Sequence, residues 1–435
     1  MSEQNSRRNR RYFIGLFSAG CLTLVILVVT PLIAGAWWLF SGGSDDRTEA
    51  FRAKGYPTTI EELEAWYPEP PEGENAAELY MTAGHRLYVS RSPARDEVPL
   101  LGDAEWPPLG TPISDTTRES ISAFINHESE AFDLIDQAVA FEHSRYPVQF
   151  VWDEESTYIS YMELMRDAQY GQQLRVLDAV GRSKPDDVLK EFATLVHVAR
   201  SLRSEPTMIA SSIGNSSAFD VVYVAEYVLD EVVLSSTQLK QLDESLALLL
   251  ENDSLLRGSV GGWCEARNRS KWDEWFAKAI GMPLANDETM ADRVEFAEDG
   301  LPKRIDDYGE LSDRAYSTEN DFSGFSRWEY VYHVGEYYGS RANVSAARAA
   351  IAIQRWRGEG NVLPDDFEGF PESILSNWPI DPFSGDPLRY KKEQEGFIVY
   401  SIGGGLKVDG GALGDALDTT DIGTNPHDVV FRILK

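Results

Sequence analysis

The sequence predicts a mainly α-helical protein with a single N-terminal transmembrane helix, an antiparallel bundle of helical hairpins and a small C-terminal β hairpin or meander. Three observations predict this fold class. A long uncharged stretch lies near the N-terminus, apolar residues recur at helical spacing through the middle of the chain, and short strand-like runs occur near the C-terminus. The length of 435 residues, with 43% hydrophobic and 26% charged residues, indicates a folded protein with more than one subdomain.

The first element is an apolar stretch at residues 12–40 that contains no charged residue. About 20 apolar residues are enough to cross a bilayer. Four arginines precede this stretch, so the positive-inside rule places residues 1–11 in the cytoplasm as a basic tail. We therefore expect a single-pass protein of the cell (inner) membrane, with residues 12–40 as the transmembrane helix and the bulk of the chain extracytoplasmic.

A cleaved signal peptide is the alternative interpretation of the same stretch. Ala34, Gly35 and Ala36 fit the A-x-A cleavage pattern, and cleavage after Ala36 would leave a mature chain that begins at Trp37. The apolar region is about 20 residues long, however, whereas signal peptides have apolar regions of roughly 7 to 15 residues. The length therefore favours a permanent anchor.

The net charge of −31 is distributed unevenly along the chain. Residues 1–40 contain four arginines and one glutamate, a net charge of 4 − 1 = +3, which leaves −31 − 3 = −34 for the remainder. A surface this acidic repels phosphate backbones, so we expect no nucleic-acid binding. The acidity favours cations or basic partners, or it serves solubility alone.

The region after the anchor is predicted as a linker at residues 41–57, followed by an extracytoplasmic helical domain at residues 58–358. In this domain Thr58 or Thr59 is expected to cap a short helix before a proline-rich break at residues 68–71, and another helix begins near Asn75. Apolar residues within residues 117–142 predict one further helix. Cys264, the only cysteine outside the apolar stretch, is expected to be a buried small hydrophobe.

The middle of the chain predicts four helices that begin near residues 157, 185, 206 and 236. The strongest apolar repeat covers residues 188–202, and Ser235 with Gln238 forms a capping-box pattern at the start of the fourth helix. Short turns between these helices imply antiparallel hairpins. Their unequal spacing excludes a tetratricopeptide array of 34-residue repeats. A final helix is expected at residues 344–357.

Aromatic residues are concentrated at residues 259–340, where helical periodicity is weak. We expect a long loop that packs its rings on the bundle; the alternative is an aromatic cleft that houses the active site of an envelope hydrolase at residues 263–338. The rings concerned are Trp263, Trp272, Trp275, Phe276, Trp328, Tyr330, Tyr332, Tyr337 and Tyr338.

Motifs for phosphate binding, dinucleotide binding and zinc proteases are absent, so no catalytic residue is identified. The nearest pattern to a nucleophile elbow surrounds Ser216, but it lies in a helix-like stretch instead of a strand-to-helix turn. His333 and Glu336 have a spacing that places both on one helix face, where they would supply two metal ligands without an identifiable third.

Residues 359–435 predict a small β module with strands at residues 388–391 and 396–401 and a closing strand at residues 429–434. Its motifs are Asp381, Pro382, Phe383, Gly385 and Pro387, then Tyr400, Ser401 and Gly403, then Asp409, Gly410 and Gly411. This pattern resembles the C-terminal part of the major pseudopilin of type II secretion. The apolar segment lacks the acidic residue found in pseudopilin helices, so we do not expect a pilus subunit.

The pseudopilin resemblance implies a calcium site in the loop that contains Asp409, Asp418 and Asp421, since carboxylates on a glycine-rich loop suit a hard cation. The alternative is a solvated acidic loop without metal. We expect no other cofactor.

The whole chain resembles a family of uncharacterised bacterial membrane-anchored envelope proteins, through residues 62–68, residues 73–77 and the C-terminal motifs. This resemblance implies an architecture and no activity. The sequence therefore predicts a binding or scaffold role in the envelope, with a protein or peptide partner.

Overall fold

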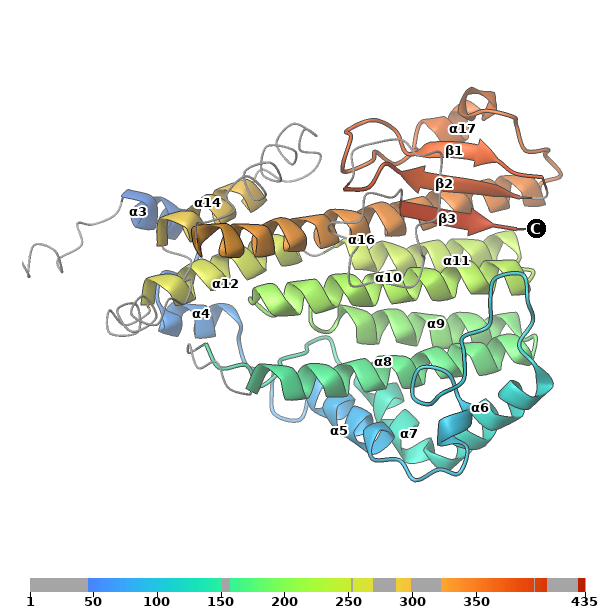
Figure 1. Cartoon of the computed structure of the whole chain (residues 1–435), viewed down its shortest axis with the longest axis horizontal. Helices are drawn as coiled ribbons and strands as arrows, with labels where there is room; N and C mark the ends of the chain where they lie inside the picture. The colour runs from blue at the N-terminus through green and yellow to red at the C-terminus, as the bar shows by residue number, and fades with distance from the viewer. Residues whose placement is uncertain are drawn as a thin grey trace, which may run out of the picture. The chain divides into compact units, whose positions relative to one another are not determined.

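The computed structural model describes residues 46–150, 157–251, 253–268, 287–298, 322–394, 396–404 and 429–434. It is mainly helical, with a small three-stranded antiparallel sheet near the C-terminus (Figure 1). The chain forms two compact units, Met1–Tyr56 and Pro57–Lys435. In the first unit, α3 (Asp46–Ala53) occupies part of the stretch predicted as a linker. All other elements below belong to the second unit.

The predicted cytoplasmic tail and transmembrane helix, residues 1–11 and 12–40, lie outside the described residues. Across the ranges that the structure describes, none of the helices combines the length and the apolarity that crossing a bilayer requires.

The second unit begins with two capped helices, as predicted. Thr59 caps α4 (Ile60–Trp66) by accepting a hydrogen bond from the amide of Glu62, and the Glu62 carboxylate accepts one from the amide of Thr58 at 2.6 Å. Asn75 caps α5 (Ala76–Tyr88) through the amide of Ala77. These side chains satisfy amide groups that would otherwise lack partners in the first turn.

The prediction of one helix at residues 117–142 is wrong, because two helices occupy this stretch. They are α6 (Asp115–His127) and α7 (Ser129–Ala138), and the break lies at Glu128. The amide of Glu128 bonds to the carbonyl of Phe124 and ends α6, while its carboxylate binds the hydroxyl of Ser90. The break lets Phe124 and Phe132 enter the same core from two helix directions.

The four predicted helices of the bundle are confirmed as α8 (Thr157–Gly181), α9 (Pro185–Arg200), α10 (Met208–Glu231) and α11 (Ser236–Ala247). α9 packs against α8, α10 and α11, and short connections join consecutive helices. In Figure 1 α5, α8, α9 and α10 lie side by side in this order, and each packs against the next. The capping box is present, since Ser235 and Gln238 each accept a hydrogen bond from the other's amide.

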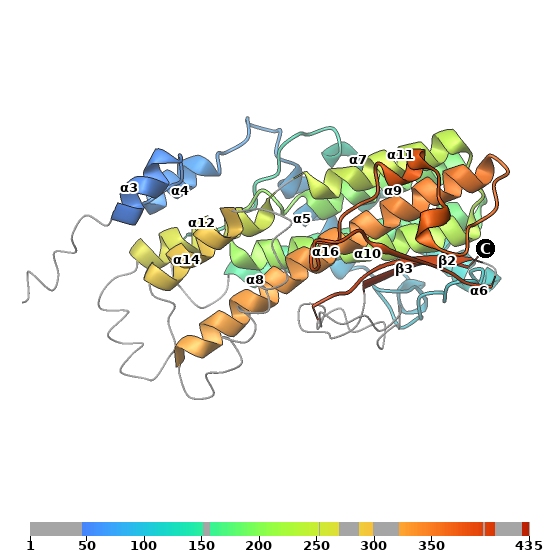
Figure 2. The ribbon, with the colours of Figure 1, turned by 90° about the horizontal axis from the view of Figure 1, so that it is seen from above.

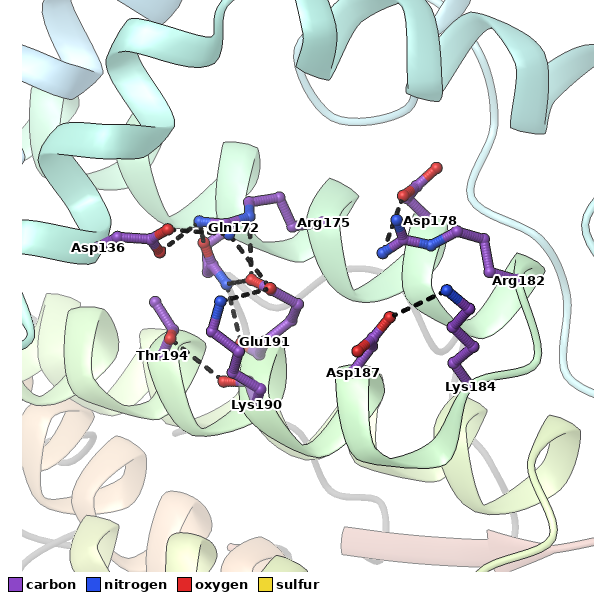
Figure 3. Close-up of polar contacts among 10 residues, drawn as sticks. All are labelled: Asp136, Gln172, Arg175, Asp178, Arg182, Lys184, Asp187, Lys190, Glu191 and Thr194. Atoms are coloured by element: carbon purple, nitrogen blue, oxygen red, sulfur yellow. Dashed lines mark hydrogen bonds and ion pairs between the residues drawn. The ribbon is translucent and has the colours of Figure 1, made fainter.

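A partly buried ionic network joins α7, α8 and α9 (Figure 3): Glu191 is buried, Arg175 is half-buried and Asp136 is exposed. Arg175 of α8 contacts Asp136 of α7 at 2.6 Å and Glu191 of α9 at 2.9 Å. The side-chain amide of Gln172 donates to the backbone carbonyl of Glu191 at 2.9 Å. The charges of Arg175 and Glu191 are paired and hydrogen-bonded, which is the arrangement that an ion pair away from water needs. We therefore regard this network as structural.

The predicted long loop at residues 259–340 is wrong, because helices occupy its described parts. These are α12 (Ser254–Asn268), α14 (Asp287–Glu298) and α16 (Phe322–Gly358), the last of which includes the predicted final helix at residues 344–357. Residues 334–340 are buried on every side of α16. A helix that is buried all round shows no amphipathic repeat in its sequence, which explains the wrong prediction.

The C-terminal segment contains η4 (Phe367–Gly369), α17 (Glu372–Leu375) and the three strands β1 (Arg389–Lys392), β2 (Phe397–Ser401) and β3 (Val429–Ile433). The strand predictions are confirmed, and the sheet is antiparallel in the order β1-β2-β3. β2 and β3 pack on α16, and β3 also contacts α10 (Figures 1 and 2). Phe397, Val399 and Phe431 share one hydrophobic core with the helices.

Candidate functional site

A pocket of about 380 Å³ lies where the α9–α10 connection meets the end of α4 and the side of α12. It is lined by residues 66–71, residues 142–144, Ser204 and Arg257, and we call it the Trp66 pocket. Trp66 is half-buried, Tyr67 is buried, and Glu142 and His143 are exposed. The volume is at the lower end of the range of roughly 300 to 1,000 Å³ that is typical of ligand sites.

One wall of the Trp66 pocket is held in place by hydrogen bonds to residues 143–146. The Tyr67 hydroxyl accepts from the amide of Tyr146 at 3.0 Å, and the Asn75 side chain bonds both the amide and the carbonyl of Arg145 at 2.9 and 2.8 Å. Arg145 also forms ion pairs with Glu64 and Glu69. The segment that carries the sequence resemblance therefore builds a fixed wall, which is favourable for binding.

Arg257 supplies an uncompensated cation to this pocket. Its guanidinium lies over the ring of Trp66 at 4.3 Å, and it donates to the carbonyls of Ser204 at 2.9 Å and Trp66 at 3.5 Å. No carboxylate in the described part of the chain pairs with it. Partial burial lowers the pKa of its guanidinium, but arginine keeps its charge at any physiological pH.

Two glycines of α12 bring this helix onto the α9–α10 connection and so place Arg257. A Cβ atom on Gly261 would lie 1.7 Å from the carbonyl oxygen of Pro206, and one on Gly258 would lie 3.0 Å from that of Thr207. Only glycine permits so close an approach at position 261. The position of Arg257 is therefore set by backbone packing between segments about 50 residues apart.

A layer of buried polar side chains lies beside the pocket. The Tyr146 hydroxyl bonds Ser201 at 2.7 Å, and the rings of Tyr146 and Tyr161 stack at 5.4 Å. The Tyr161 and Thr207 hydroxyls donate to one oxygen of Glu205, at 2.7 and 2.9 Å. The other oxygen of Glu205 is buried without a partner among the described residues.

Glu205 is therefore a buried carboxyl that no cation of the described residues contacts. Burial raises its pKa to about 7, and the hydrogen bonds from Tyr161 and Thr207 oppose this rise. A carboxyl that titrates near neutral pH beside a pocket is a marker of functional sites. Glu205 does not itself line the pocket, so its effect on a ligand would be indirect.

Neither Arg257 nor Glu205 was identified by sequence reasoning. Both belong to large sets of charged residues, and their roles depend on tertiary contacts. Trp66 and Tyr67 belong to the segment that carries the family resemblance, but the sequence did not assign them to a site.

The predicted calcium ligands Asp409, Asp418 and Asp421 lie outside the described residues. In the part of the chain that is described, no three His, Cys, Asp or Glu side chains gather in an arrangement that suits a metal ion.

The described rings of the aromatic region are mostly core. Trp263, Tyr337 and Tyr338 are buried, whereas Trp272, Trp275 and Phe276 lie outside the described residues. Trp328 and Tyr330 lie on α16. The buried rings therefore form no open cleft. Cys264 is buried, as predicted, and burial raises the pKa of its thiol to about 12, so it is unreactive.

His333 and Glu336 lie close together on α16, with Nδ1 and Oε2 3.6 Å apart. The Glu336 carboxylate accepts hydrogen bonds from the hydroxyls of Ser212 and Ser216 of α10. These serines donate to the carboxylate and not to the histidine, so the group lacks the serine–histidine contact of a catalytic triad. The segment around Ser216 lies inside α10, far from any strand-to-helix turn.

Comparison with known proteins gives no further assignment: no family model matches the chain, and no curated protein or solved structure matches it.

Proposed function

We propose that this chain is a binding protein of the cell envelope, anchored in the membrane by residues 12–40, which holds an acidic segment of a protein or peptide partner in the Trp66 pocket. The observation that carries this proposal is the half-buried guanidinium of Arg257, which has no carboxylate partner in the described part of the chain. A partner carboxylate would complete its coordination.

The energetic reason is that a partly desolvated charge gains from an opposite charge much more than a fully hydrated one does. An arginine and a carboxylate form short, charge-assisted hydrogen bonds. Around Arg257, the ring of Trp66 and the prolines of residues 68–71 offer apolar contact to the rest of a bound segment. Arginine beside tryptophan and tyrosine is common at protein-binding surfaces, where these residue types are enriched.

The charge of the chain narrows the type of partner further. Residues beyond position 40 carry a net charge of −34, which attracts basic surfaces over long distances. The partner is thus basic overall and inserts one acidic side chain into the pocket. The pocket is small, so only one or two side chains enter it.

Site-specific photo-cross-linking in intact cells tests this proposal. A photoreactive amino acid at Pro71, which is exposed and lines the pocket, is expected to give a discrete adduct with the partner. The same amino acid at Lys240 on α11 serves as the control, because this exposed position lies outside the pocket. Loss of the adduct in Arg257→Met would support the proposal; an adduct that persists in this variant, or identical adducts at both positions, would refute it.

A further inference from the structure

A second and larger pocket, of about 560 Å³, lies between α11, α16 and the segment that follows α17. We call it the Arg355 pocket, after the residue of α16 that lines it together with Asp243, Arg348, Trp356 and Trp378. Its volume falls well within the range of small-molecule sites. None of these residues contributes to the Trp66 pocket, so the inference below does not depend on the function proposed above.

The charges of the Arg355 pocket are only partly paired. Arg348 binds Asp243 through two hydrogen bonds, at 2.7 and 3.3 Å, so this pair is neutral. Arg355 forms no hydrogen bond or ion pair with any described residue, and its Nε atom is buried without a partner. Glu359 also lines the pocket but is exposed. Arg355 is therefore a cation in position to bind an anion.

The aromatic part of the pocket is held rigidly by contacts outside it. The indole nitrogen of Trp378 donates to the carbonyl of Leu388 at 2.7 Å, and Trp378 stacks on Phe370 at a centroid distance of 6.0 Å. Phe370 also meets Trp356 edge to face at 5.4 Å. These contacts fix both tryptophans without a ligand, so binding would cost little side-chain entropy.

We infer that the Arg355 pocket binds a carboxylate carried on an apolar or aromatic group. The guanidinium of Arg355 takes the carboxylate, and Trp356 and Trp378 pack against the apolar part of the ligand. This chemistry occurs both in free aromatic acids and in the C-terminal residue of a peptide that ends in an apolar side chain.

Calorimetric titration of the full chain with N-acetylphenylalanine tests the inference. We expect saturable binding of N-acetylphenylalanine. The affinity for N-acetylphenylalaninamide, which has the same body without the charge, should be lower by about tenfold or by a larger factor. A five-residue peptide that ends in phenylalanine distinguishes the two sources. Binding about tenfold tighter than that of the single residue identifies a peptide terminus as the ligand, and equal binding identifies a free acid.

Four variants connect the binding to Arg355. Arg355→Gln is expected to lose at least about tenfold in affinity, while Arg355→Lys loses less, because it keeps the charge without the fork of the guanidinium. Glu359→Gln is expected to bind as well as the unchanged protein or better, because a competing anion is removed. Arg357→Gln removes the same charge from the same helix outside the pocket and serves as the matched control.

The thermal unfolding midpoint of each variant shows whether it folds. Absence of saturable binding by the unchanged protein overturns the inference. So does equal affinity for the acid and the amide, or undiminished binding by a folded Arg355→Gln variant.

Discussion

The Asp381 carboxylate accepts a hydrogen bond from the Ser401 hydroxyl at 2.8 Å, which joins the segment before β1 to the end of β2. The same fully buried carboxylate accepts the amides of Phe383 at 2.9 Å and Ile402 at 3.0 Å. Asp381 and Ser401 belong to separate parts of the pseudopilin-like sequence pattern. Their contact gives a physical reason for this pattern, because one buried carboxylate closes the start of the sheet module against its central strand.

Replacing Asp381 is expected to destabilise the fold strongly. Asp381→Ala leaves two buried amides and one hydroxyl without their acceptor, which should lower the free energy of unfolding by about 3 kcal/mol or more. Ser401→Ala removes the bond to Asp381 and the bond that the hydroxyl accepts from the amide of Gly403, and it should cost less, about 1 to 2 kcal/mol. Urea denaturation of both variants measures the difference. Equal costs would show that Asp381 does not organise this corner.

Gly261 is expected to tolerate no side chain. In Gly261→Ala the added Cβ meets the carbonyl of Pro206, so α12 must move and the free energy of unfolding should fall by about 1 to 3 kcal/mol. Gly358→Ala is the matched control, since a Cβ there meets no atom within 4 Å and alanine favours helix. Thermal unfolding compares the two. A neutral Gly261→Ala would contradict the close approach that places Arg257.

The buried carboxyl of Glu205 should make the fold less stable as the pH rises. Its pKa is about 7 in the folded chain and about 4.5 in the unfolded chain, so folding takes up a proton between these values. Its contribution is complete below about pH 4.5 and is lost as the pH rises through about 7; the total is on the order of 3 kcal/mol.

Chemical denaturation at several pH values measures this dependence. Glu205→Gln, which keeps an acceptor for Tyr161 and Thr207 but cannot ionise, should flatten the part of the slope that Glu205 causes. Glu78→Gln, at an exposed position of α5, should leave the slope unchanged. An unaltered pH dependence in Glu205→Gln would contradict the assignment.

Arg175 should contribute far more to stability than an exposed arginine does. Arg175→Met leaves the buried carboxylate of Glu191 with only the more distant ammonium of Lys190, at 3.7 Å, and the amide of Gln172, at an expected cost of about 3 kcal/mol. Arg86→Met breaks an exposed pair with Glu130 and should cost less than about 1 kcal/mol. Guanidinium titrations give both values. Adding Glu191→Met to the first variant should restore part of the loss, and a further loss would argue against this explanation.

Local sequence signals predicted much of the helical fold correctly. Thr59, Asn75 and Ser235 mark helix starts because a cap needs only the side chain and amides two or three residues away. The amphipathic repeat of α9 and the runs that predict the strands are also signals within a few neighbouring residues. Residues 334–340 of α16 were mispredicted because burial on all sides removes the repeat.

The sites were much less predictable than the elements. Arg257 is significant only because Gly261 brings α12 against Pro206, and Arg355 only because Trp378 and α11 enclose the same space. Such contacts join residues far apart in the sequence, and no spacing of residue types predicts them. Both arginines lack a carboxylate partner among the described residues, and this can be recognised only once their neighbours are known.

α16 runs without interruption for 37 residues, a length of about 55 Å at the usual helical rise. It carries Glu336, which binds the serines of α10, and also Arg355, roughly five turns further along. A continuous helix is stiff along its axis. The Arg355 pocket and the contacts of Glu336 with α10 therefore share one rigid element, so a shift of α16 at either place carries to the other.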